Sequence, residues 1–172
     1  MNIQNREITR QAVVAAIYVV VSLAMAPISL GPLNFRLSEG LNLLALYDKK
    51  YIRGVVVGVF ITNLFAYGIY DMIIGTASTY IFLHLGVWVA DRVSKKMNNK
   101  MDNFQLTILR YGILTIIFSL SMFTIAAMLV FIIDTGEAFW PLYVYLVVSE
   151  ALAMILGGLI VYPVMKRIDF EN

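Results

Sequence analysis

The residues of this 172-residue chain that could recognise a ligand are polar side chains inside apolar stretches of membrane-spanning character. Arg36, Glu39 and Asn42 follow one another at intervals of three, directly after a run rich in Pro and Gly. Ionised groups and non-helical backbone persist at membrane depth only when they are buried in protein or line a cavity. The segment 26–40 is therefore the first candidate for a ligand site or its lid.

Later in the chain, two further acidic residues are each followed by small residues on the same helix face. Asp71 and Gly75 share one helical face, and Glu150 and Gly157 share another. Each stripe of small residues leaves space for a flat ligand to lie close to the backbone. A lone carboxylate in the middle of a span, such as that of Glu150, costs about 2.5 to 3.5 kcal/mol of insertion free energy. The candidate substrate-binding residues, with the aromatic ones as stacking walls, are Phe35, Arg36, Glu39, Asn63, Tyr67, Asp71, Gly75, Trp140 and Glu150.

Structural roles are an alternative for several of these residues. Arg36 and Glu39 are spaced to neutralise each other, and Asp71 is placed to cap the fourth span from a wet loop. Asn63 can hydrogen-bond a neighbouring backbone group. The single histidine, His84, is expected to be a packed or hydrogen-bonded core residue rather than a ligand.

The signatures of catalysis are missing from the sequence. There is no cysteine, no Gly-x-x-x-x-Gly-Lys-Ser/Thr phosphate loop and no His-Glu-x-x-His metal motif. No serine lies in the strained turn that a nucleophile elbow requires. We therefore expect neither an enzyme nor a bound cofactor or metal.

The composition indicates an all-α integral membrane protein. With 60% apolar and 14% charged residues, the chain has too few polar residues to cover the surface of a soluble globular protein. We expect one transmembrane domain over 1–172. The predicted spans are 8–26, 37–47, 54–66, 69–90, 107–133 and 141–165. The second and third spans are short for a bilayer, which points to a binding site nearby.

The positive charges fall on one side of these six spans. Every Lys and Arg except Arg36 lies in or beside the ends and connections of one face. By the positive-inside rule this face is cytoplasmic, which predicts a multi-pass protein of the cell membrane with both termini inside. The opposite connections carry Asp71, Asp134 and Glu137, so we expect the polar pocket to open outward.

Small residues mark where helices approach closely. Gly54 and Gly58 predict packing within the bundle, since residues four apart form a smooth patch. Ala12 and Ala16, with Ala15 beside them, form a similar patch in the cytoplasmic half of the first span, far from the pocket.

The run APISLGPLNFRLSEGL (26–41), with Asn63-Leu64 and DMIIG (71–75), resembles the QueT family. The members are substrate-binding S components of energy-coupling factor (ECF) transporters, assigned to a queuosine precursor. The likeness covers the chain from about Ala12 to the end of the fourth span, and the last two spans match by pattern. It implies six helices, both termini inside, an outward-capped pocket and a scaffold-docking patch on the first helix, which Ala12, Ala15 and Ala16 fit.

The mechanism that this resemblance implies is capture from outside followed by toppling of the whole subunit in the bilayer. The partners would be an EcfT-like transmembrane scaffold protein and two ABC ATPases, with no nucleic acid involved. A 7-deazaguanine suits the site, because a carboxylate can accept the paired N–H donors of the guanine edge. A second acid could meet an aminomethyl cation.

A different class of function is also open. An autonomous ion- or proton-coupled carrier would use Glu39, Asp71 and Glu150 as a relay. Such carriers often contain inverted repeats, and none is evident in this sequence.

Overall fold

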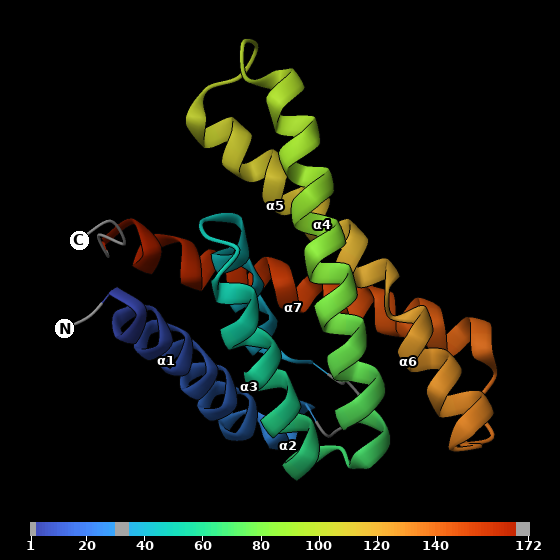
Figure 1. Cartoon of the computed structure of the whole chain (residues 1–172). Helices are drawn as coiled ribbons and strands as arrows, with labels where there is room; N and C mark the ends of the chain where they lie inside the picture. Colours follow the sequence, from blue (N-terminus) through green and yellow to red (C-terminus); the bar gives the residue numbers. More distant parts are fainter. Residues whose placement is uncertain (1–2, 30–34, 168–172) are drawn as a thin grey trace.

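The computed structural model describes residues 3–29 and 35–167, and within these ranges all regular structure is helical (Figure 1). In chain order the elements are α1 (Ile3–Ala24), α2 (Ala26–Ser29), the 3₁₀ helix η1 (Leu37–Leu46), α3 (Tyr51–Ala66), the π-helical segment η2 (Asp71–Gly75), α4 (Thr76–Met97), α5 (Asn103–Leu120), α6 (Phe123–Ala127), the π-helical segment η3 (Met128–Ile132) and α7 (Phe139–Arg167).

Four helical segments of the described part are long and apolar enough to cross a membrane: Asn5–Ala24, Asp71–Met97, Asn103–Ile132 and Phe139–Met165. Two shorter apolar helices, Leu37–Leu46 and Tyr51–Ala66, coincide with the predicted second and third spans. The chain is therefore a multi-pass, all-helical membrane protein. The count of six spans and the cytoplasmic position of the termini stay predictions.

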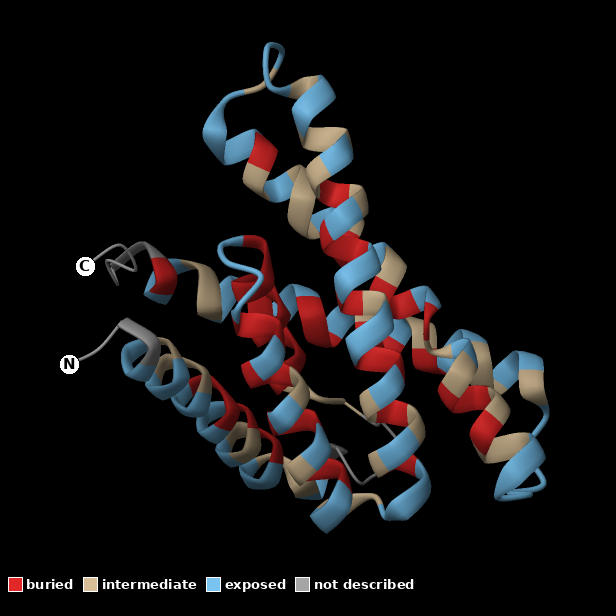
Figure 2. Ribbon diagram, viewed as in Figure 1, coloured by how far each residue is buried: buried red, intermediate tan, exposed pale blue. Residues whose placement is uncertain are grey.

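The short helix η1 lies at the centre of the molecule. It is contacted by α1, α3, α4, α5 and α7, and its residues from Ser38 to Leu46 are all buried (Figure 2). Because a 3₁₀ helix rises about 2.0 Å per residue, its ten residues cover about 20 Å, against about 15 Å for an α-helix of the same length. The 3₁₀ geometry also aligns residues three apart, which places Arg36, Glu39 and Asn42 along one edge.

Glycines set the closest approaches between helices around η1. A Cβ atom on Gly157 of α7 would lie 2.6 Å from the carbonyl oxygen of Leu37 and 2.7 Å from Cα of Gly40. A Cβ atom on Gly54 of α3 would lie 2.6 Å from the carbonyl oxygen of Gln11 in α1. These backbones touch, so no side chain fits between them, and the predicted packing role of Gly54 is confirmed.

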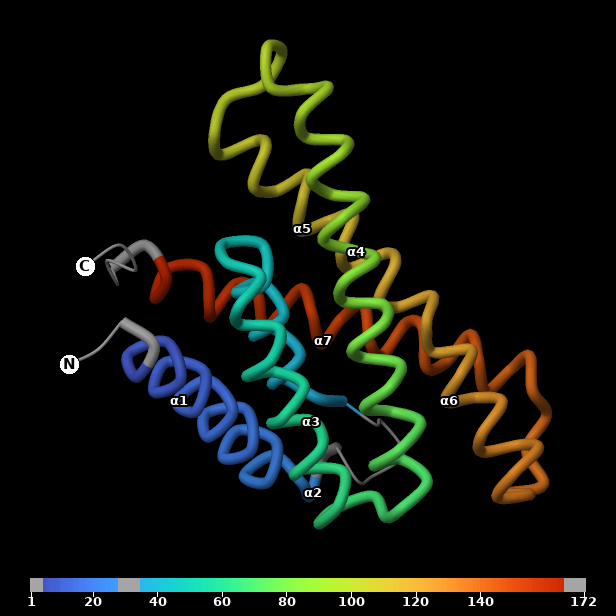
Figure 3. The backbone as a smooth tube through the Cα atoms, in the orientation of Figure 1, coloured from blue at the N-terminus to red at the C-terminus, as the bar shows by residue number. Residues whose placement is uncertain are grey.

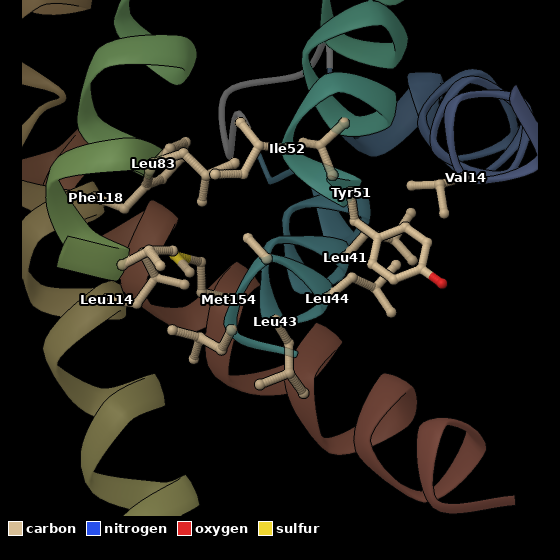
Figure 4. Close-up of a cluster of buried hydrophobic side chains, with 14 of the residues drawn as sticks. Val14, Leu41, Leu43, Leu44, Tyr51, Ile52, Leu83, Leu114, Phe118 and Met154 are labelled. Carbon is tan, nitrogen blue, oxygen red and sulfur yellow. The ribbon is translucent and has the colours of Figure 1, made fainter. Parts of the chain in front are cut away.

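Apolar side chains from five elements complete this core (Figure 4). Leu43 of η1, Ile52 of α3, Leu83 of α4, Leu114 of α5 and Met154 of α7 are each almost fully buried. A helix that buries all its faces must be surrounded by others, and η1 meets that condition in this core.

The predicted fifth span is not one continuous helix. The α-helical hydrogen bonding is interrupted at Ser121, between α5 and α6. The Ser121 hydroxyl donates to the carbonyl oxygen of Phe118 at 2.6 Å, and the Thr124 hydroxyl donates to that of Ser121 at 2.9 Å. Such bonds from Ser and Thr side chains bend helices, so the fifth span, which runs as one apolar segment over Asn103–Ile132, is interrupted locally at Ser121.

The predicted break near residue 27 is observed in the part that the structure describes. α1 ends at Ala24, Met25 forms a turn, and the single helical turn α2 contains Pro27. Gly31 and Pro32, the other predicted helix breakers, lie outside the described residues. The first and last helices are longer than predicted, since α1 begins at Ile3 and α7 runs from Phe139 to Arg167.

Candidate functional site

A small polar cavity lies beside the N-terminal end of η1. Its volume is about 30 Å³, and its walls come from η1, the start of α4, the α5–α6 break and α7. The lining residues are Arg36, Glu39, Gly75, Ser78, Thr79, Phe118, Met122, Ile125, Leu146 and Glu150. Of the predicted site residues, the structure thus brings Arg36, Glu39, Gly75 and Glu150 to one place.

Arg36 is held from behind by three other predicted site residues. Its Nη1 donates to Oδ1 of Asn63 at 3.3 Å, and its Nη2 lies 3.7 Å from Oδ1 of Asp71. The guanidinium carbon lies 3.9 Å from the ring centroid of Tyr67, a cation–π contact. Asn63, Asp71 and Tyr67 do not line the cavity, so in this geometry they position Arg36.

Asn63 and Gly75 join α3 to the start of the fourth span. The Nδ2 of Asn63 donates to the carbonyl oxygen of Asp71 at 2.9 Å, which matches the structural role left open for it. A Cβ atom on Gly75 would lie 2.8 Å from this Nδ2. The missing side chain at Gly75 therefore leaves the space that the Asn63 amide occupies. Asp71 is buried in η2 and pairs with Arg36; it is therefore not a cap in a wet loop.

Glu39 is fixed by hydrogen bonds at both carboxylate oxygens. The Tyr18 hydroxyl donates to Oε1 at 2.5 Å, and the Asn42 amide donates to Oε2 at 2.8 Å. Arg36, the neutralising partner that the spacing offered for Glu39, forms its ion pair with Asp71 instead. Tyr18 was not among the predicted site residues, although a tyrosine within an apolar span needs a hydrogen-bond partner when it is buried.

Glu150 differs from Glu39 because one of its oxygens is free. The residue is 5% exposed, and Oε1 has no hydrogen-bond partner among the described residues. A buried acceptor without a donor is uncommon in proteins and calls for a ligand or water at that position. The cavity therefore offers one open carboxylate oxygen opposite a fixed arginine and a fixed carboxylate.

Two predicted stacking residues lie away from the cavity lining. Trp140 is 71% exposed and packs edge-on against Phe139, with ring centroids 5.2 Å apart. Phe139 in turn stacks on Tyr143 at 6.0 Å. Exposed aromatic clusters at helix ends are typical of the membrane interface, which accounts for Trp140 without a ligand. Phe35 is half-buried and does not line the cavity either.

The apolar walls of the cavity were not predicted. Phe118, Met122, Ile125 and Leu146 are ordinary apolar residues in apolar helices, and no spacing in the sequence distinguishes them. His84 was expected in the core but is exposed, with Nδ1 2.8 Å from the carbonyl oxygen of Tyr80 in its own helix.

The predicted docking patch on α1 is divided by the fold. Ala12 and Ala16 are exposed, whereas Ala15 is 6% exposed and packed inside the molecule. Val14 and Tyr18 of α1, which are buried like Ala15, pack against Gly54 and Gly58 of α3. A partner helix can therefore reach Ala12 and Ala16 but not Ala15 in this structure.

Comparison with known proteins places the chain in a family. A family model described as the QueT transporter matches residues 8–167. The chain belongs to the QueT transporter family. It is 37% identical over 170 residues to the queuosine precursor transporter QueT of Lactococcus lactis subsp. cremoris (strain MG1363), with 96% of each chain covered. No solved structure matches it significantly.

Membership of the QueT family confirms the resemblance seen in segment 26–41. It places the chain among transporters rather than enzymes. In the described residues, no group of three or more His, Cys, Asp or Glu side chains is arranged to hold a metal ion. The cavity lining combines charged and hydroxyl-bearing side chains with apolar walls, which suits reversible binding of a small polar molecule.

Proposed function

We propose that this chain is the substrate-capture subunit, or S component, of an ECF importer in a prokaryotic plasma membrane, and that it binds a 7-deazaguanine-type queuosine precursor. The name of its Lactococcus lactis relative supports the substrate class. The observation that carries the proposal is the free Oε1 of Glu150, which lies in a polar cavity with Arg36 and Glu39.

The available hydrogen-bonding groups suit the edge of a guanine-like base. Such an edge presents two N–H donors to a carboxylate and a carbonyl oxygen to a cationic donor. Both oxygens of Glu39 already accept hydrogen bonds, so Glu150 is the better acceptor for the base. Arg36 keeps N–H donors beyond those directed at Asn63 and Asp71, and these can meet the carbonyl oxygen.

The cavity must widen before such a ligand fits. Its volume of about 30 Å³ suffices for a water molecule, whereas sites for small organic ligands measure about 300 to 1,000 Å³. We assign the opening to Met122 and Ile125 at the α5–α6 break, where the helix is already interrupted. The captured base would then be enclosed when this wall returns.

Uptake would follow from docking of α1 on the EcfT-like scaffold. Ala12 and Ala16 form an exposed face of small residues, and without a hydrophobic drive inside lipid, close packing of small residues is a main source of helix association. Toppling of the docked subunit would carry the base across the bilayer, and ATP hydrolysis by the two partner ATPases would reset the cycle.

The experiment is to replace Ala12 or Ala16 by Trp and to measure binding and uptake separately. We expect the isolated variants to keep their affinity for the deazaguanine, because the patch does not line the cavity, while uptake and co-purification with the scaffold are lost. Ala77→Trp is the matched control, since Ala77 is an exposed alanine of α4. Normal uptake by the Trp variants would contradict the proposal.

The same experiment distinguishes the autonomous carrier. A carrier using Glu39, Asp71 and Glu150 would take up the base in liposomes that contain this chain alone, driven by an ion gradient and without ATP. Such uptake would exclude the S-component mechanism even if the cavity binds the base as proposed.

A further inference from the structure

The helical hairpin of α4 and α5 carries a polar hollow that the transport site does not use. The hollow has a volume of about 470 Å³ and lies between the end of α4 and the start of α5. Its polar lining residues are Ser94, Lys95, Asn98, Asn103, Thr107 and Arg110. Two of these side chains are cationic and none is acidic, so the hollow is suited to an anion.

Arg110 is held in a fixed position at the wall of this hollow. Its Nη2 donates to the carbonyl oxygen of Leu46 and to Oδ1 of Asp91, both at 2.8 Å. Its Nε is buried and has no acceptor among the described residues. The guanidinium is thus oriented by protein groups at the wall of the hollow.

Two acids lie on the elements that form the hollow, Asp91 on α4 and Asp102 at the start of α5. Asp91 also pairs with Lys49, whose Nζ lies 3.0 Å from its second oxygen. Asp102 caps α5, accepting from the backbone N–H of Gln105 at 2.7 Å. Asp91 carries one negative charge against both Arg110 and Lys49, and among the described residues neither acid forms an ion pair with Lys95, so the hollow keeps an excess of positive charge.

An apolar groove adjoins the hollow along α5. It has a volume of about 510 Å³ and runs between α5 and α7, which diverge toward the α4–α5 loop (Figure 3). Thr107 lines both the hollow and the groove. A Cβ atom on Gly112 would meet no atom within 4 Å, so the groove is open at this position. Polar and apolar surfaces therefore meet at one residue.

The position of the hollow along the membrane normal matches the lipid headgroup region. Trp88 of α4 is half exposed, and the guanidinium carbon of Arg92 lies 4.9 Å from its ring centroid. Exposed tryptophan is enriched at the interface between bilayer and water. Lys95 lies about one helical turn beyond Arg92, on the water side of the interface that Trp88 marks. The groove continues along α5 toward Ile116, on the membrane side of that interface.

We propose that the α4–α5 hairpin binds one anionic phospholipid, with its phosphate between Lys95 and Arg110 and an acyl chain in the groove between α5 and α7. Basic clusters beside a transmembrane helix attract anionic lipids, and each Lys or Arg contributes about 1 kcal/mol. The combination of a fixed arginine, an uncompensated lysine and an adjoining apolar groove distinguishes this site from a diffuse basic surface.

The test is native mass spectrometry of the full chain titrated with dioleoyl phosphatidylglycerol, dioleoyl phosphatidylcholine or inorganic phosphate. We expect one phosphatidylglycerol to bind roughly 25-fold more tightly than phosphatidylcholine, about fivefold from each cation. Lys95→Gln should weaken this binding about fivefold. Lys96→Gln, which removes an exposed charge outside the hollow, should leave it unchanged.

Gly112→Leu tests the groove, because Gly112 lines the groove proposed for the acyl chain and does not line the hollow proposed for the phosphate. It should weaken phosphatidylglycerol binding without lowering the unfolding temperature of the lipid-free protein. Equal binding of the two lipids would overturn the proposal, as would equal effects of Lys95→Gln and Lys96→Gln. Displacement of the lipid by equimolar inorganic phosphate would show a site for soluble anions instead.

Discussion

The two sides of the ligand cavity are built in different ways. On one side, η1 is enclosed by α1, α3 and α7, whose backbones cross at glycines, and a large apolar cluster surrounds it, to which α4 and α5 also contribute. On the other side, the fourth span starts in the π-helical segment η2 and the fifth is interrupted at Ser121. In the described residues, the apolar cluster of this second side has only four buried members: Ile125, Ala126, Met128 and Leu146.

This difference assigns separate tasks to the two sides. The glycine-packed side fixes Arg36 and Glu39, whose partners leave them little freedom. The irregular side supplies Met122 and Ile125 as cavity walls. Segments with few buried apolar contacts open at lower free energy than packed cores. We therefore expect the irregular side to move when a ligand enters and the glycine-packed side to stay.

The largest effect should come from disrupting the glycine-packed side with Gly157→Ala. The added methyl would overlap the backbone of η1, which no rotamer change relieves, so we expect a loss of stability of about 3 kcal/mol, the upper end for overpacked cores. Denaturant unfolding in detergent measures it. Gly112→Ala is the control and should not destabilise, since open space surrounds that position. Equal stability of the two variants would refute the close crossing.

A smaller effect is expected where the two sides meet, in Glu150→Gln. The change keeps the shape of the side chain but removes its charge, and a hydrogen bond to a charged group contributes about 1.5 to 3 kcal/mol. Affinity for a 7-deazaguanine should therefore fall about 10- to 150-fold, as measured by calorimetry. Glu137→Gln, in an exposed connection, should bind like the wild type. Unchanged affinity in a folded Glu150→Gln protein would transfer the role of acceptor to Glu39.

The smallest effect concerns closure of the irregular side. The hydroxyls of Ser78 and Thr124 lie 3.0 Å apart and connect α4 to α6. Because a neutral hydrogen bond contributes about 0.5 to 1.5 kcal/mol, Thr124→Val should favour the open cavity and speed ligand association about two- to tenfold. Stopped-flow fluorescence measures this rate. Thr9→Val, which removes a hydroxyl bond within exposed α1, should have no effect. Slower association in Thr124→Val would contradict the assignment of the moving side.

The glycine-packed side was also the more predictable from sequence. Gly54 and the cluster around Arg36 and Glu39 stand out because their residue types are unusual in apolar segments. On the irregular side Asp71 and Gly75 also stand out, but the break at Ser121 carries no such signal, since it depends on hydroxyl bonds that form only in the folded helix. Asn63, Asp71 and Tyr67 were predicted to contact the ligand, whereas in the structure they contact Arg36. Spacing in the sequence does not distinguish a polar residue that lines the cavity from one that lies behind the lining.

The position of the ligand is tested most directly by filling the cavity. Ser78 lines it, whereas Ala77 is exposed on the same helix, so Ser78→Leu and Ala77→Leu are matched variants. In calorimetric titrations with a 7-deazaguanine, we predict one binding site for the wild type and for Ala77→Leu, and no binding for Ser78→Leu. Wild-type affinity in a folded Ser78→Leu protein would contradict the account, because the base would then bind elsewhere.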